Sequence, residues 1–267
     1  MRMDLATSAS SPERPNEDWA SVALPASGQG GSLVVLDGVT PPKGDDGCEH
    51  TVHWFTARLG GALLELSVSR PDTPLAGILS AAIRRTADTH RHSCDLSHVR
   101  TPQATVVLVR WGGPSDEVEH LVLSDSTLLI ESPEGGVRAV RDDRLDRLPR
   151  EALRTHASAD ALRNAEGGFF TAAADPGVAA RAVTGRTPRS EVRSVVALTD
   201  GASRWVDMFG RGDWGQCLGL LRKEGAQGLI DRVREAETET ARERAETGAG
   251  PIRWKLHDDA TAVLAEL

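Results

Sequence analysis

The chain has 267 residues and a formal net charge of −8 at pH 7. A length of this order fits one domain over residues 1–267, and the acidic balance argues against a general nucleic-acid binder, which needs a basic face to neutralise phosphates. No apolar stretch approaches the about 20 residues of a membrane span and no basic-then-apolar leader opens the chain, so we expect a cytoplasmic protein with no nucleic-acid or membrane partner.

The first half of the chain predicts a hairpin, two helices and a meander. Residues 1–15 are small and polar, and we expect an extended lead-in there instead of a core element. Apolar runs and turn residues then predict strands over 19–24, 32–36, 104–110, 117–123 and 127–132. Between these strands, apolar residues at helical spacing predict one helix over 52–66 and a second that begins at Thr73-Pro74 and carries its apolar stripe to Thr86.

In the second half, the charged segment 133–168 is interpreted as a flap-like insertion with a short helix. Beyond it the pattern predicts a short helix from Asp175-Pro176, a strand over 195–198, a helix through 214–221, a long helix after Gly225 and a last strand from Ala260. Runs of strands with helices grouped in pairs favour an α+β fold of two antiparallel sheets packed together, with helices outside them.

Acidic residues stand at five predicted strand ends. Two apolar runs stop abruptly at Asp-Gly, at Asp37-Gly38 and Asp200-Gly201, and a third stops at Ser124-Asp125-Ser126. Two more acidic pairs, Glu17-Asp18 and Asp258-Asp259, come immediately before strands. A single Asp-Gly is usually a turn, but five carboxylate groups brought together would repel one another unless cations lay between them. The pattern therefore predicts a divalent-metal site.

These motifs, taken in order, resemble the metal-dependent type 2C Ser/Thr protein phosphatases, especially the bacterial members. The resemblance spans nearly the whole chain and rests on Asn16-Glu17-Asp18, Leu36-Asp37-Gly38, Pro102-Gln103-Ala104-Thr105, Ser124-Asp125-Ser126, Thr199-Asp200-Gly201 and Asp258-Asp259-Ala260-Thr261. It implies a four-layer α-β-β-α sandwich and a signalling enzyme that hydrolyses phosphate monoesters of a phosphorylated protein. It also implies two Mn²⁺ or Mg²⁺ ions, with a third that binds more weakly.

The resemblance assigns roles by position. Asp37 corresponds to the acid that bridges both metals, and Gly38 offers its backbone carbonyl. The remaining positions are Asp200 and Asp258 at one metal, Glu17 or Asp18 at the other, and Asp125 with Asp200 at the weaker third ion. Asp37 and Asp200 would act in catalysis through a water activated by the metals, so no protein nucleophile is required.

Several helper residues depart from the family pattern. Val39 stands where many members have a histidine that protonates the leaving oxygen, and Glu13 stands where the phosphate-binding arginine is expected, with Arg14 one place later. We assign the phosphate contact to Arg14. Ser124 replaces the usual glycine, and Asp259 replaces an asparagine and so adds an acid.

The histidines and cysteines allow other interpretations. His50 and His53 on the first helix could replace the missing acid, although a helix histidine beside Trp54 is more often a packing residue. The stretch 89–94, with His98 nearby, superficially looks like a zinc cluster but has no recognised ligand spacing, so we expect no zinc there. The three cysteines are too few for a disulfide framework and are expected to be reduced thiols.

Two other functions remain open from the residues. A haloacid-dehalogenase-like phosphatase would use Asp37 as its nucleophile, but it needs an acid two residues later, where Val39 stands. A pseudophosphatase that binds a phosphoprotein or signalling partner would account for the missing histidine and the displaced arginine. The retained acids argue against it, because a pure binding module has no evident need to crowd carboxylates.

Overall fold

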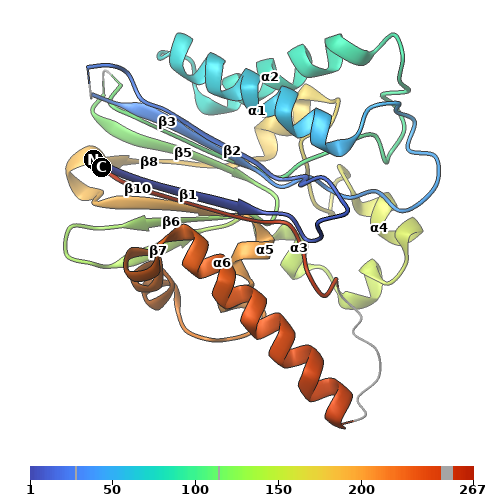
Figure 1. Ribbon diagram of the computed structural model, residues 1–267. Helices are drawn as coiled ribbons and strands as arrows, with labels where there is room; N and C mark the ends of the chain where they lie inside the picture. Colours follow the sequence, from blue (N-terminus) through green and yellow to red (C-terminus); the bar gives the residue numbers. More distant parts are fainter. Residues whose placement is uncertain (28, 114, 248–254) are drawn as a thin grey trace.

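Two antiparallel five-stranded sheets lie face to face in the computed structural model, which describes residues 1–27, 29–113, 115–247 and 255–267 (Figure 1). The first sheet has the order β1 (Arg2–Ser8), β10 (Ala260–Glu266), β9 (Ser194–Leu198), β6 (Thr127–Glu131) and β7 (Val137–Val140). The second has the order β2 (Trp19–Ala23), β3 (Gly31–Leu36), β4 (Val106–Trp111), β5 (Glu117–Leu123) and β8 (Val183–Pro188).

Helices cover the outer face of each sheet. The pair α1 (Val52–Ser69) and α2 (Leu75–His90) lies on the second sheet, and α5 (Asp200–Asp207) and α6 (Trp214–Thr247) lie on the first (Figure 1). The predicted α+β class and α-β-β-α order are therefore confirmed. Gly225 interrupts α6 with a φ of 82°, which matches the predicted separation of two helical stretches there.

The central strands of each sheet are buried on both faces. Along β3, Leu33 and Val35 enter the core between the sheets, whereas Val34 and Leu36 enter the core beneath α1 and α2. Such a strand has an unbroken apolar run because neither face meets water. The strand therefore delivers Asp37, the first polar residue after the run, to the end of the sandwich.

Three edge strands differ from the sequence-based expectation. The predicted lead-in contains β1, which pairs with β10, and the predicted insertion begins with β7, which pairs with β6. Strand β8 pairs with β5 and was not predicted. Edge strands have one side in solvent and therefore carry few buried side chains. In β1, for example, Ala6 is the buried residue. The sequences of such strands therefore have no strong apolar run.

Short helices complete the chain. Within the predicted insertion these are α3 (Arg144–Arg147), the 3₁₀ turn η1 (Arg150–Leu153) and α4 (His156–Leu162), and outside it η2 (Pro176–Arg181) and η3 (Arg189–Glu191). In Figure 1, α3 and α4 lie at the end of the sandwich away from the chain termini. No helix among the described residues has the length and apolar character needed to cross a bilayer.

A close contact between α1 and β2 generates a stability prediction. A Cβ atom added at Gly60 would lie 2.2 Å from the Trp19 ring, whereas one added at the neighbouring Gly61 would meet nothing within 4 Å. We expect Gly60→Ala to destabilise the protein by about 1–3 kcal/mol through overpacking. The matched Gly61→Ala should stabilise it by about 0.5–1 kcal/mol, because alanine favours a helix interior. Chemical denaturation of both variants measures this, and equal effects would refute the packing.

Candidate metal centre

Strand direction brings the predicted acids to one end of the sandwich. The antiparallel registers make β3, β5 and β9 end where β2 and β10 begin (Figure 1). Asp37, Asp125 and Asp200 follow the first three strands, and Asp18 and Asp258 precede the other two. All five thus lie near one another, and the charges of the other four each act on Asp37.

Burial and mutual repulsion control the protonation of this group. Burial first, and then the charges of Asp200 and Asp18, raise the pKa of Asp37 well above its usual value. Burial, followed by Asp125 and Asp258, raises the pKa of Asp200 to about 7, against a lowering effect of Arg204. These carboxyl groups keep some exposed surface, yet the protein around them is dense enough for desolvation to dominate. A bound cation would offset both the desolvation of these carboxylates and the repulsion between them.

Asp18 has one oxygen fixed and one free. Its Oδ2 accepts hydrogen bonds from Thr199 Oγ1 at 3.0 Å and Thr261 Oγ1 at 2.7 Å. Its Oδ1 is buried without a hydrogen-bond partner. Burial raises the pKa of Asp18 to about 8 despite these two hydrogen bonds. A buried, unpartnered carboxylate oxygen beside other acids is chemically suited to a hard divalent cation.

The loop that carries Glu17 is held against the centre by other residues. Glu17 Oε2 accepts a hydrogen bond from Thr40 Oγ1 at 2.5 Å, and the Glu17 backbone N–H donates to Asp259 Oδ2 at 2.7 Å. The Ser10 N–H donates to the other Asp259 oxygen at 2.6 Å. Asp259 thus holds two backbone segments in place. A Cβ at Gly38 would lie 2.6 Å from the Glu17 carbonyl oxygen, so the close approach of this loop requires glycine.

Asp258 is already paired with cations. Its Oδ2 accepts from Arg204 Nη2 at 2.9 Å, and its Oδ1 accepts from Lys255 Nζ at 3.0 Å. Lys255 also donates to Thr40 Oγ1 at 3.1 Å. Although burial opposes its charge, the pKa of Lys255 is raised by Asp258 and, further away, by Asp37 and Asp200. The sequence analysis did not identify Lys255. Its position three residues before Asp258 was the only indication that it lies near the acids.

The turn after β5 explains one departure from the family pattern. Ser124 has a φ of 69°, in the left-handed region where glycine is usual. Its Oγ contacts Asp125 Oδ1 at 3.3 Å, and its N–H donates to Asp142 Oδ2 at 2.9 Å. Burial raises the pKa of Asp125. Serine at this position therefore accepts backbone strain and supplies a hydroxyl that fixes Asp125.

Three other candidates have contacts of a different kind. Arg14 is exposed in a turn, where its N–H donates to the Ser11 carbonyl at 3.3 Å. Arg204 and Lys255, by contrast, form ion pairs with Asp258. His53 Nδ1 bonds the Asn16 carbonyl at 2.8 Å. His50 stacks on Trp54 with the ring centroids 3.9 Å apart. These contacts favour structural roles for both histidines.

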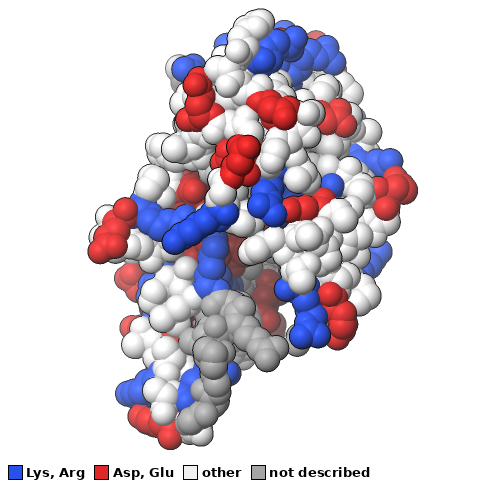
Figure 2. Space-filling view, turned by 90° about the vertical axis from the view of Figure 1, so that its right-hand side faces the viewer, with Lys and Arg blue, Asp and Glu red and all other residues white. Residues whose placement is uncertain are grey.

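Figure 2 looks onto this end of the molecule, where Lys and Arg side chains border a recess that contains acidic side chains. Beside Asp37, a cavity of about 20 Å³ is lined by Val39, Thr40, Arg100, Asp160 and Arg163, among others. Arg100 Nε donates to Asp160 Oδ2 at 2.8 Å, which ties α4 to this rim.

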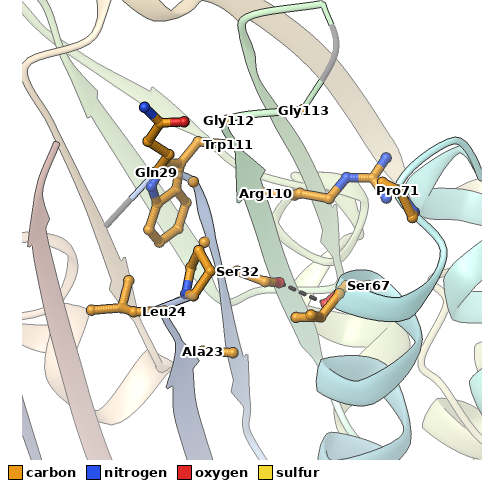
Figure 3. A pocket seen from close by; sticks show the side chains of 14 residues that line it. Ala23, Leu24, Gln29, Ser32, Ser67, Pro71, Arg110, Trp111, Gly112 and Gly113 are labelled. Carbon is orange, nitrogen blue, oxygen red and sulfur yellow. Dashed lines mark hydrogen bonds between the residues drawn. The ribbon is translucent and has the colours of Figure 1, made fainter. Parts of the chain in front are cut away.

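A larger cleft of about 240 Å³ lies at the opposite end of β3 (Figure 3). Its lining includes Leu24, Ser67 and Trp111 and is mostly apolar. The Arg110 guanidinium at the edge of the cleft donates hydrogen bonds to the Glu119 carboxylate and to the backbone carbonyls of Arg70 and Thr73. A six-residue strand separates this cleft from Asp37 by about 20 Å, so the cleft is not part of the acid centre.

Comparison with known proteins assigns the chain to a family. The family model described as Protein phosphatase 2C matches residues 7–243. The chain therefore belongs to the protein phosphatase 2C family. A comparison with curated protein sequences finds no match.

Solved structures of bacterial phosphatases have the same fold. A bacterial serine phosphatase bearing a point mutation is 14% identical with a TM-score of 0.60, over 100% of this chain and 97% of that chain. The Mycobacterium tuberculosis Ser/Thr phosphatase PstP/Ppp is 17% identical with a TM-score of 0.59, over 100% and 98%. The PstP catalytic domain in complex with two manganese ions is 17% identical with a TM-score of 0.57, over 99% and 97%.

The raised pKa values predict how the stability of the metal-free protein depends on pH. The pKa values of Asp18 and Asp200 are about 8 and 7 in the folded chain, against an ordinary value of 3.8 for aspartate, so folding takes up protons. The stability that these groups contribute is complete below 3.8 and is lost as pH rises through 7 and 8. We expect the melting temperature in EDTA to fall by several degrees from about pH 5.5 to about pH 8.5.

Two further measurements test the cause of this pH dependence. Asp18→Asn removes one titrating group and should flatten the profile, and excess Mn²⁺ should raise the melting temperature most at the alkaline end. A melting temperature that is constant or increases over this range in metal-free wild type would contradict the assignment.

Proposed function

We propose that this chain is a metal-dependent phosphatase that hydrolyses phosphoserine and phosphothreonine esters in protein substrates. The observation that carries the proposal is the group of buried, mutually repelling carboxyl groups around Asp37, together with the unpartnered Oδ1 of Asp18. Membership of the protein phosphatase 2C family and the two manganese ions of the PstP complex support the same chemistry.

The proposed ligands divide between two principal ions. Asp37 lies among the other acids and is suited to bridge both ions, with the Gly38 carbonyl beside it. Asp200 and Asp258 would complete one position, and Glu17 or Asp18 the other. Asp125, close to Asp200, would contribute to a third, weaker position. Mn²⁺ or Mg²⁺ bound there would supply an activated water and stabilise negative charge on the phosphoryl group.

Lys255 is proposed as the cation that contacts substrate phosphate, a role that the sequence assigned to Arg14. Its Nζ lies 3.0 Å from Asp258 and 3.1 Å from Thr40 Oγ1, whereas Arg14 is exposed in a turn. A cation binding Asp258 would compete with Lys255 for the same carboxylate. The released ammonium group would then be available to balance phosphate charge.

A catalytically weak pseudophosphatase is the second candidate. The observation that favours it is that both oxygens of Asp258 are engaged by Arg204 and Lys255. If these ion pairs persisted with Mn²⁺ present, one expected ligand would be missing and turnover would be low. The protein would then act by binding a phosphoprotein or a signalling partner.

Metal dependence distinguishes the two candidates. We expect hydrolysis of a phosphothreonine peptide to require Mn²⁺ or Mg²⁺ and to be lost in EDTA. Asp37→Asn should abolish turnover while the metal-free variant stays folded and melts at the same or a higher temperature, because a buried carboxyl group that is costly to ionise is replaced by a neutral amide. The exposed Asp72→Asn serves as the matched control and should retain wild-type activity. Undiminished activity in metal-free protein would refute the two-metal assignment.

The valine at position 39 predicts an unusual dependence on the leaving group. A serine phosphate leaves as a basic alkoxide and gains about 10²–10⁴-fold from a general acid, whereas p-nitrophenolate hardly needs one. We therefore expect a wider gap between kcat for p-nitrophenyl phosphate and kcat for a phosphoserine peptide than in a relative with histidine there. Val39→His should narrow that gap.

The control for this prediction is His53→Ala, since His53 is bound to a backbone carbonyl and should not act as the acid. If Val39→His left the ratio of the two kcat values unchanged and His53→Ala slowed only the peptide, a helix histidine would be the proton donor.

A further inference from the structure

Two cysteines and two histidines converge beside the acid centre but outside it. Cys48 and His50 belong to the loop that leads into α1, and His90 and Cys94 lie at the end of α2 and in the turn after it. One potential ligand atom from each residue lies within 4.8 Å of the others. Among the described residues, a convergence this tight occurs in this cluster and not among the carboxylates.

Three sulfur–nitrogen distances within the cluster are close to the edges of a metal-centred tetrahedron. His50 Nδ1 lies 3.8 Å from Cys48 Sγ and 3.4 Å from Cys94 Sγ, and His90 Nδ1 lies 3.5 Å from Cys48 Sγ. Tetrahedral zinc with ordinary bond lengths separates sulfur and nitrogen ligands by about 3.6 Å. Both histidines turn the same nitrogen inward, as a shared ligand requires.

The two sulfur atoms are 2.8 Å apart. This is longer than a disulfide bond of about 2.0 Å and shorter than the separation of about 3.8 Å for two thiolates on one zinc ion. A rotation that opens the pair by about 1 Å would complete the tetrahedron. A disulfide, by contrast, would leave the inward-facing nitrogens of His50 and His90 without a function.

The surroundings hold the four side chains in place. The His50 N–H donates to Cys48 Sγ at 3.4 Å, a hydrogen bond that favours the thiolate. The Asp95 N–H donates to the Gly47 carbonyl at 2.7 Å and joins the two segments directly. Trp54 covers both rings, with centroids 3.9 Å from His50 and 5.2 Å from His90. His90 is buried, and the other three side chains are partly exposed, so an ion can enter.

We propose that Cys48, His50, His90 and Cys94 bind one structural Zn²⁺ ion that fastens the loop before α1 to the end of α2. Two thiolates would neutralise the ion, and four protein ligands close the tetrahedron without a position for substrate. The proposal is independent of the phosphatase activity.

The position of the site explains why the protein would need it. The loop from Val39 to His50 has no regular secondary structure, yet it carries Thr40, which contacts both Glu17 and Lys255. Thr51 follows directly and caps α1 by accepting a hydrogen bond from the Trp54 N–H at 3.2 Å. A metal that fixes Cys48 and His50 would therefore fix the entry of α1 and limit the movement of the loop beside the acids.

The sequence analysis considered a different set of residues. It took the stretch 89–94 with His98 and found no ligand spacing, whereas the cluster combines His90 and Cys94 with two residues about 40 positions earlier. Cys48 and His90 are separated by 42 positions, and Cys48 and Cys94 by 46. The contact between α1 and α2, and not local spacing, brings the four together.

Metal analysis and cobalt substitution test the proposal on the full chain. Protein purified with added ZnSO₄ and then desalted should contain about one zinc per chain. After replacement by Co²⁺, the protein should show thiolate-to-cobalt charge transfer and intense tetrahedral d–d bands. Carboxylate ligands cannot produce the charge-transfer band, so this readout separates the site from the acid centre.

Variants assign the ligands. Cys48→Ser and Cys94→Ser should each abolish the cobalt charge-transfer spectrum or weaken Zn²⁺ binding at least 100-fold, whereas the ligand-retaining His90→Cys should keep about one zinc per chain. The controls are Cys217→Ser, at a buried position of α6, and His92→Asn, at an exposed position in the turn beside Cys94. Both variants should bind Zn²⁺ like wild type. Asp37→Asn should also keep the zinc.

Three outcomes would overturn the proposal. One is wild-type protein that binds no Zn²⁺ under reducing conditions. Another is a Cys48–Cys94 disulfide in protein prepared with zinc and reductant, detected as a mass lower by two hydrogens and by the linked peptide. The third is a cobalt spectrum that Cys48→Ser and Cys94→Ser leave unchanged, which would place the metal elsewhere even if those variants were less stable.

Discussion

Burial of carboxyl groups that also repel one another is the constraint on which this end of the molecule depends. Asp37 is held at the end of a fully buried strand, and the charges of Asp18, Asp125, Asp200 and Asp258 all act on it. The strands cannot relax to separate these groups without disrupting the cores on both of their faces. The remaining means of compensation are protonation, internal cations and bound metal ions. The raised pKa values are consistent with the first, and the ion pairs of Asp258 with Arg204 and Lys255 provide the second.

The cations nearest the acids tie distant elements to the centre. Arg204 on α5 reaches Asp258 and also Glu237, a fully buried acid on α6. Lys255 links Asp258 to Thr40 on the opposite side of the centre. Any ligand that displaces one of these contacts therefore acts on both sheets and on the loop before α1.

The loops around the centre are held by two kinds of polar anchor. Asp259 fixes the lead-in by accepting from the Ser10 and Glu17 N–H groups, so an extra acid at this position is used for backbone support. On the other side, the Cys/His cluster holds the loop that carries Thr40. Both anchors act on segments without regular secondary structure, which have few apolar contacts to hold them.

The sequence by itself determined the parts of the protein whose signal is local. Apolar runs buried on both faces predicted β3, β5, β6 and β9, helical spacing predicted α1 and α2, and abrupt Asp-Gly endings predicted which acids would meet. The edge strands β1, β7 and β8 carry weak patterns because half of each faces solvent, so only pairing with a neighbour defines them. Tertiary structure alone decided that Lys255 and not Arg14 reaches the acids, and that Cys48 and His50 meet His90 and Cys94. The contacts of Lys255 with Thr40 and of the two cysteines with each other join residues far apart in the chain. Their formation depends on the packing of whole sheets and helices instead of on any spacing along the sequence.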